Sequence, residues 1–211
     1  MSASRHSQVS TTSRPPPCGS LGEAAQPGTA CGLPQRRQVT GGSIRLELRE
    51  LRGLAPHRIA NLVVATIPER RKVFPSLTIR ENLELARARW EVLEIHQSFR
   101  QILEMADRKA GQLSGGQRQL LALMTALGRT PKVLVIDEFT LGLASGADAQ
   151  VAEAVTAAAQ GSRLGIILIE QNVAVAQKLC SRVYIMQSGR MVWSGGASSL
   201  DETVLERGYF E

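Results

Sequence analysis

The stretch GQLSGGQRQLLALMTALGRTPKVLVIDEF, residues 111–139, decides the fold of this 211-residue chain. Gln117 follows Ser114 at the spacing of a helix N-terminal capping box. Apolar residues then recur with helical period at Leu120, Leu123, Met124 and Leu127. We therefore expect a helix whose N-terminal cap is Ser114.

Gly115 and Gly116 stand in the first turn of this expected helix. Glycine inside a helix costs roughly 1 kcal/mol relative to alanine, so two in succession indicate a gain of another kind. Without Cβ atoms, the free N–H groups of the first turn can approach an anion closely, and the helix dipole favours negative charge there. The pair indicates a phosphate site, and an ordinary glycine-containing loop before a capped helix is the alternative.

Two carboxylates end the apolar run that follows. After Gly128 and Pro131, residues 133–136 are Val-Leu-Val-Ile, a pattern typical of a parallel strand buried on both faces. Asp137 and Glu138 follow at its carboxyl end, where open α/β sheets bind ligands, and alternation sends their side chains in different directions. One could hold Mg²⁺ while the other takes a proton from an attacking water. A solvated acidic turn is the alternative.

Together the two patterns resemble the ATP-binding cassette of ABC transporters, whose signature motif is LSGGQ and whose Walker B strand is similar to VLVIDE. The resemblance implies an α/β, P-loop NTPase-like layered fold with a helical subdomain and a C-terminal β-hairpin. It also implies ATP and Mg²⁺ as cofactors. In the family two cassettes face each other head to tail. The residues expected to contact ATP held by the partner cassette are Ser114, Gly115, Gly116 and Gln117.

The residues around this core are similar to cassettes of branched-chain amino acid importers. TIPERRKVFPSLTIRENLELA, residues 66–86, resembles their Q-loop region and places Glu69 at the position that is glutamine in most cassettes. TLGLASG, residues 140–146, resembles their D-loop. The D-loop residues carried over are Leu141, Gly142 and Leu143. Phe139 and Ser145 replace prolines that are usual in the family, and the sequence gives no physical reason for either change.

Further residues of the resemblance follow the D-loop. IILIEQN, residues 166–172, is similar to the switch strand and places Gln171 where most cassettes have histidine. RVYIMQSGRMVWSG, residues 182–195, alternates as two strands around a Ser-Gly turn and is like the family's terminal hairpin. The resemblance implies that Glu138 and Gln171 are catalytic and that Asp137 holds Mg²⁺ through water.

The Walker A loop of the family, G-x-x-x-x-G-K-[ST], does not occur in the sequence, and the resemblance begins near Thr40. That loop would hold the ATP served by Asp137, Glu138, Glu69 and Gln171. Removing even one donor from such a site can cost about 3 kcal/mol of transition-state stabilisation. We therefore expect ATPase activity of ABC type by family, with weak or no hydrolysis by the chain alone.

Composition separates residues 1–39 from the rest. This segment is rich in Ser, Thr, Pro, Gly and Ala and has one acidic residue against four arginines. It predicts a disordered low-complexity tail, and residues 40–211 predict a partial cassette with its helical subdomain at about 77–127. Since half of the chain's net charge of +6 belongs to the tail, the basic balance gives no reason to expect a nucleic-acid partner.

Several function classes are excluded. No apolar run approaches the ~18 residues of a membrane span. The three cysteines lack CxxC spacing, so neither a disulfide framework nor a zinc site is indicated. The chain has no GxSxG motif, and a serine hydrolase is not supported.

The secondary structure can be expected in outline. We expect strands at 43–49, 62–67, 133–136 and 164–169, and helices at 56–61, within 77–105 around a joint at Trp90, at 148–160 and at 172–180. Helix alternating with buried strand indicates an α/β layered fold.

By resemblance the chain is the ATP-binding subunit of an importer that couples ATP hydrolysis to uptake of branched-chain or related amino acids. It would lie peripherally on the cytoplasmic face of the inner (plasma) membrane. Its partners would be a second cassette in a homo- or heterodimer, transmembrane permease subunits and, indirectly, a periplasmic binding protein. Two alternatives stay open: a catalytically incompetent module that lends its LSGGQ helix to a partner's ATP site, or a gene fragment. Importers of urea or short amides share much of this sequence, so the sequence does not decide between these cargoes.

Overall fold

The computed structural model describes residues 41–69, 72–89, 91, 93, 96–139, 146–160 and 163–201. The chain divides into two compact units, Met1–Ile59 and Ala60–Glu211. The tail expected at 1–39 lies outside the described residues, as do the Trp90 joint and the D-loop residues Leu141, Gly142 and Leu143.

The described part of the first unit holds a small hairpin. Strands β1 (Arg45–Leu46) and β2 (Arg49–Glu50) pair antiparallel, and α1 (Pro56–Ala60) follows where a helix is expected. The expectation of one strand over 43–49 is wrong, because Glu47 takes a left-handed φ of 55° and turns the chain. The Glu50 carboxylate then fixes the turn region by accepting the Ile44 N–H at 3.0 Å.

A parallel sheet forms the centre of the second unit. Its strands are β3 (Val64–Ile67), β4 (Val133–Asp137) and β5 (Gly165–Ile169), in the order β3-β4-β5. The register pairs Ile67 with Ile136, and Asp137 with Ile169, so all three carboxyl ends lie at one edge. This confirms the parallel sheet expected from the apolar run before Asp137 and Glu138.

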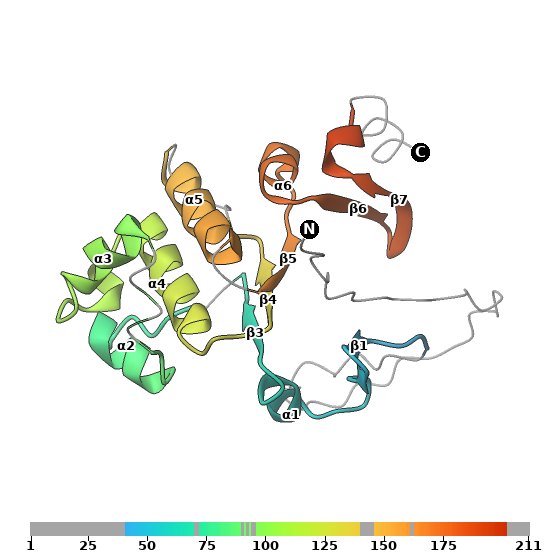
Figure 1. The fold of residues 1–211 in the computed structure, drawn as a ribbon. Coiled ribbons are helices and arrows are strands. Elements are labelled where there is room, and N and C mark those ends of the chain that lie inside the picture. The colour runs from blue at the N-terminus through green and yellow to red at the C-terminus, as the bar shows by residue number, and fades with distance from the viewer. Residues whose placement is uncertain are drawn as a thin grey trace, which may run out of the picture. The chain divides into compact units, whose positions relative to one another are not determined.

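Helices and a hairpin complete this unit (Figure 1). The helices are α2 (Ile79–Leu85), α3 (Gln97–Leu103), α4 (Gly115–Leu127), α5 (Ala147–Gln160) and α6 (Val173–Leu179). The hairpin joins β6 (Arg182–Gln187) to β7 (Arg190–Gly196). Its turn residues Ser188 and Gly189 have φ of 47° and 78°, the positive values that a two-residue type I′ turn requires. The Ser-Gly turn predicted from the sequence is therefore confirmed.

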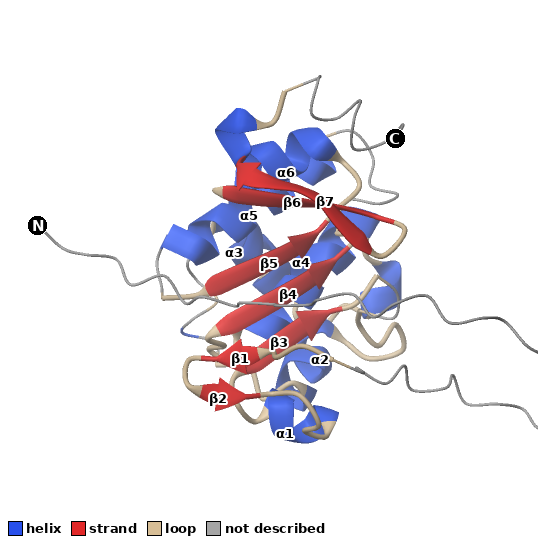
Figure 2. Ribbon diagram, turned by 90° about the vertical axis from the view of Figure 1, so that its right-hand side faces the viewer, coloured by secondary structure: helices blue, strands red, loops and turns tan. Residues whose placement is uncertain are grey.

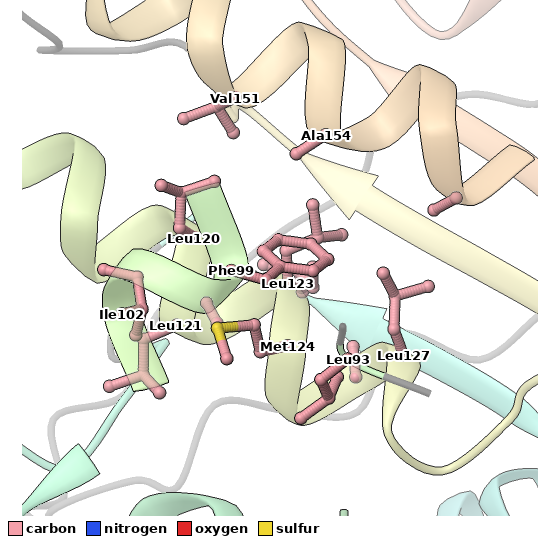
Figure 3. Packing of buried hydrophobic residues seen from close by; sticks show 14 of the residues in the cluster. Leu93, Phe99, Ile102, Leu120, Leu121, Leu123, Met124, Leu127, Val151 and Ala154 are labelled. Carbon is pink, nitrogen blue, oxygen red and sulfur yellow. The ribbon is translucent and has the colours of Figure 1, made fainter. Parts of the chain in front are cut away.

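Helix α4 is the centre of the hydrophobic core. Its buried residues are Gly116, Gln119, Leu120, Leu121, Ala122, Leu123, Met124, Ala126 and Leu127. Figure 3 shows side chains of α4 against Phe99 and Ile102 from α3 and against Val151 and Ala154 from α5. A helix that is apolar on nearly every side is stable only when it is buried all round, which explains why several elements pack on α4.

The two faces of the sheet differ in burial. Leu134 and Ile136 of β4 are fully buried on the face that the helices cover, and Figure 2 shows α3, α4 and α5 behind the strands. On the other face, the paired row of Thr66, Val135 and Ile167 is exposed or half-buried. The sequence predicts burial of this strand on both faces. On the second face Val133, at the start of β4, is 5% exposed, whereas Val135 is half-buried, so the prediction is confirmed only in part.

Two leucines of the second unit test this description of the core. Leu123 of α4 is 1% exposed and Leu85 of α2 is 60% exposed. We expect Leu123→Ala to lower the free energy of unfolding by about 2–5 kcal/mol, because truncation leaves a cavity in the core. Leu85→Ala, the matched control, should change it by about 0.5 kcal/mol or less. Urea unfolding of the two variants measures both values, and equal losses would contradict the assigned core.

Candidate functional site

The candidate site lies at the carboxyl ends of β4 and β5, beside the loop that precedes α2. Asp137 ends β4, and Glu138 follows it directly. Glu170 and Gln171 follow β5, which ends at Ile169. Because β4 and β5 are adjacent parallel strands, residues separated by more than thirty positions in the sequence meet at this edge.

Glu138 and Gln171, the two residues expected to be catalytic, are in contact. The Gln171 side chain donates from Nε2 to Glu138 Oε1 at 2.5 Å. The Glu138 backbone N–H donates to the Ile169 carbonyl at 2.9 Å, which fixes the start of the turn. The structure therefore brings together the acid after β4 and the amide after β5.

The backbone of Glu138 has an unusual conformation. Its φ is 44°, in the left-handed region, which costs a non-glycine residue roughly 1–2 kcal/mol. Such strain is maintained only where surrounding interactions fix it, and it is frequent at functional sites. Here the surrounding interactions are hydrogen bonds of the Glu138 N–H, side chain and carbonyl.

The next residue, Phe139, has two roles. Its side chain is buried in the core, and its backbone N–H donates to Glu170 Oε1 at 3.0 Å. Proline has no N–H and cannot make this bond. The departure from the proline usual in the family thus has a physical account that the sequence did not give: position 139 ties the end of β4 to the end of β5.

Asp137 is half-buried on the end of β4, as expected for a residue that faces a ligand across the sheet edge. No three His, Cys, Asp or Glu side chains converge as a metal site within the described residues. Mg²⁺ commonly takes one or two carboxylates and completes its shell with water and substrate phosphates. The carboxylate of Asp137 fits that requirement, since it needs no three-carboxylate cluster.

The helix that begins at Ser114 is capped as predicted. Ser114 Oγ accepts the Gln117 N–H at 3.2 Å, and Gln117 Oε1 accepts the Ser114 N–H at 2.9 Å. Both halves of the capping box are therefore confirmed. The N–H groups of Gly115 and Gly116 have no acceptor within the helix, because first-turn amides lie ahead of any possible i−4 carbonyl.

The two glycines of this turn have different surroundings. Gly115 is exposed, whereas Gly116 is buried. A Cβ atom on Gly116 would lie 2.9 Å from the Cβ of Ala147, the first residue of α5. Close packing against Ala147 therefore requires glycine at position 116, which the sequence did not indicate. Of the two glycines, Gly115 is the one whose backbone is exposed to solvent.

Lys72 is a site residue that the sequence analysis did not single out. Its Nζ donates to Gln119 Oε1 at 2.7 Å and to the Glu138 carbonyl at 3.4 Å. Burial lowers the pKa of Lys72, and nearby carboxylates oppose that shift. These carboxylates, in order of effect, belong to Glu170, Glu69, Asp137 and Glu138. Glu69, the residue expected in the Q-loop, is half-buried, and its carboxylate is one of those that oppose the shift.

The loop that carries Lys72 is fixed by a buried asparagine. Asn82 Oδ1 accepts the Phe74 N–H at 2.8 Å, and its Nδ2 donates to the Thr78 carbonyl at 2.8 Å. Thr78 and Glu81 form a second capping box at the start of α2. The T-x-x-E spacing in the sequence is the signal that could have predicted this box.

No helix among the described residues is long and apolar enough to cross a membrane. The candidate site among the described residues consists of the ends of β4 and β5, the capped start of α4 and the loop that precedes α2.

Comparisons with known proteins identify the family of this chain. The family model for ABC transporters matches residues 31–141. The branched-chain amino acid transport ATP-binding protein BraG of Pseudomonas aeruginosa is 36% identical over 82% of this chain and 75% of its own length. The probable branched-chain amino acid transport ATP-binding protein LivF of Archaeoglobus fulgidus is 34% identical over 78% of this chain and 72% of its own length.

Solved structures show the same fold. A nucleotide-free ATP-binding cassette from an ABC transporter superposes with a TM-score of 0.67 at 20% identity, over 80% of this chain and 77% of that one. A cassette in its ADP conformation gives 0.64 at 22% identity, over 82% and 79%. The predicted α/β, P-loop NTPase-like fold is confirmed. The chain belongs to the ABC transporter family, among its ATP-binding cassettes.

Proposed function

We propose that this chain is the ATP-binding subunit of an ABC importer that couples ATP hydrolysis to uptake of branched-chain or related amino acids. The hydrogen bond between Glu138 and Gln171 supports the hydrolytic part, because it joins the expected base to the expected switch residue. The proposed cargo rests on the similarity to BraG and LivF, which are branched-chain amino acid transport ATP-binding proteins. These 211 residues contain no Walker A string. The proposal therefore concerns the site residues after β4 and β5 and those at the start of α4.

Glu138 is the proposed general base. Its carboxylate accepts the Gln171 amide through Oε1, and the remaining lone pairs can accept a proton from a water that attacks the terminal phosphate. Gln171 orients the carboxylate by holding one oxygen.

Asp137 is the proposed holder of Mg²⁺, through water. When bound, Mg²⁺ neutralises negative charge on phosphate oxygens. Asp137 remains paired in the sheet with Ile169, so its position is fixed by the strand and not by a loop. Glu69 is proposed to approach the same ligand from the Q-loop, and Leu141, Gly142 and Leu143 are proposed to contact the partner cassette.

The start of α4 is proposed to serve an ATP held by the partner cassette. Ser114 Oγ accepts the Gln117 N–H, which leaves its O–H free to donate to a phosphate oxygen. The exposed Gly115 offers a backbone N–H at the positive end of the helix dipole. Gly116 contributes by allowing close packing of α4 on Ala147 of α5.

The proposed assembly contains a second cassette and transmembrane permease subunits, with a periplasmic binding protein acting indirectly. The chain would lie peripherally on the cytoplasmic face of the inner membrane. ATP binding by the purified chain, alone and after mixing with the second cassette, separates this function from its alternative. Binding by the chain alone supports a full ATP-binding subunit, and binding only in the mixture supports a module that lends its signature helix.

Ser114→Ala tests the signature turn, and Thr78→Ala is its matched control. Each variant loses an N-cap side chain worth about 1 kcal/mol of stability. We expect Ser114→Ala alone to lower the ATPase rate of the assembled transporter, by about 100-fold, because it removes a donor to the transition state. Equal rates in the two variants would refute a phosphate contact at Ser114.

Glu138→Gln tests the proposed base. The amide oxygen of glutamine can still accept the Gln171 hydrogen bond, so folding should be unchanged, but glutamine cannot take a proton. We expect the ATPase rate of the assembly to fall by about 100-fold to 10,000-fold while ATP binding persists. Glu84→Gln, which removes the same charge from an exposed position on α2, should leave the rate unchanged. A Glu138→Gln assembly with a normal rate would rule out this base.

The cargo is tested in vesicles that contain the assembled transporter. We expect binding protein loaded with leucine, isoleucine or valine to stimulate ATP hydrolysis severalfold, and binding protein offered urea or a short amide to leave the basal rate unchanged. Stimulation by urea alone would replace the proposed cargo and leave the assignment of the ATP site intact.

A further inference from the structure

We propose that Lys72 is a positioning residue of the ATP site, which holds the turn at Glu138 and the first half of α4 in fixed relation through one ammonium group. This inference rests on the proposed function, since it concerns the same acid. Its basis is the bridge from Lys72 Nζ to Gln119 Oε1, at 2.7 Å, and to the Glu138 carbonyl, at 3.4 Å.

The bridge begins on a rigid support. The Asn82 side chain bonds both the N–H and the carbonyl of Phe74, at 2.8 and 3.1 Å. The Gly111 N–H donates to the Pro75 carbonyl at 2.9 Å, on the other side of the loop. The backbone that follows Lys72 is therefore fixed by hydrogen bonds at Phe74 and at Pro75, and this restricts the position of the Lys72 ammonium.

The α4 end of the bridge is buried. Gln119 is 4% exposed, and its Nε2 makes no hydrogen bond within the described residues. Its Oε1 accepts from Lys72. Burial of an amide costs free energy unless the amide is hydrogen-bonded. The bond from Lys72 offsets part of that cost for Gln119.

The other end of the bridge lies at the strained turn. The carbonyl of Glu138 accepts from Lys72 while the Glu138 N–H is held by Ile169 and its side chain by Gln171. These contacts fix the left-handed conformation from three sides. Loss of Lys72 releases the carbonyl, so the Glu138 carboxylate can rotate away from the position that Gln171 defines.

The surrounding charge favours this role over direct binding of a phosphate. Carboxylates that attract the Lys72 ammonium come from the Q-loop and from the ends of both β4 and β5: Glu69, Asp137, Glu138 and Glu170. An ammonium already paired with a buried amide oxygen and surrounded by acids acts as an internal counter-charge. It reduces the repulsion among acids that the ATP site brings together.

The experiment compares Lys72→Met, Lys72→Arg and Gln119→Met in the full chain, assembled with its second cassette and permease subunits. We expect Lys72→Met to lower kcat for ATP by about 10-fold to 100-fold with little change in KM, because misplacement of a reacting group affects the chemical step. Lys72→Arg keeps a charge that can reach both acceptors and should recover to within about threefold of the natural rate. Lys178→Met, at an exposed position on α6, is the control for loss of a positive charge and should have no effect.

The double variant Lys72→Met/Gln119→Met tests the bridge itself. If both residues act through one contact, the double variant should show about the same loss as Lys72→Met alone, because coupled residues are not additive. The positioning role would be overturned if the loss of kcat in the double variant were the product of the losses in the two single variants. It would also be overturned if Lys72→Met raised KM without lowering kcat, or had the natural kcat. Glu138→Gln in the same assembly distinguishes the two failures: if it is active, the proposed function fails, and if only Lys72→Met is active, this inference alone fails.

Discussion

The burial of α4 is the constraint on which the rest of the structure depends. Leu120, Leu123 and Met124 leave water only because the sheet and the neighbouring helices enclose them. The same helix begins at the capped Ser-Gly-Gly turn and places Gln119 beside the loop that carries Lys72. Hydrophobic packing, which has no direction of its own, thus fixes polar groups that need exact mutual placement. A shift of α4 against the sheet would change the distance between the Ser-Gly-Gly turn and the acids at the end of β4.

The local patterns of the sequence were sufficient to predict much of this arrangement. The capping box at Ser114, the strand before Asp137 and the Ser-Gly hairpin turn were predicted because each depends on residues only a few positions apart. The resemblance implied that Gln171 and Glu138 are catalytic, but the contact between them was not predicted, because it joins the ends of two strands that only the fold makes neighbours.

The features that the sequence analysis missed have a common physical cause. The Lys72–Gln119 bond and the approach of Gly116 to Ala147 join segments that are distant along the chain, so no periodicity indicates them. The turn at Glu47 was missed because it is left-handed without a glycine or asparagine. Burial of β4 on both faces was inferred from an apolar run alone. It holds at Val133 and not at Val135 on the second face, because such a run does not show what covers each residue.

The backbone of Phe139 has a consequence for motion at the site. Its N–H joins the end of β4 to Glu170, while Gln171, the next residue, joins the end of β5 back to Glu138. Residues 138–139 and 170–171 are therefore joined by two hydrogen bonds, and neither pair can move away from the other without breaking them. A ligand that displaces the Glu138 carboxylate would therefore also move the Gln171 side chain, so the two side chains would respond to ligand binding together.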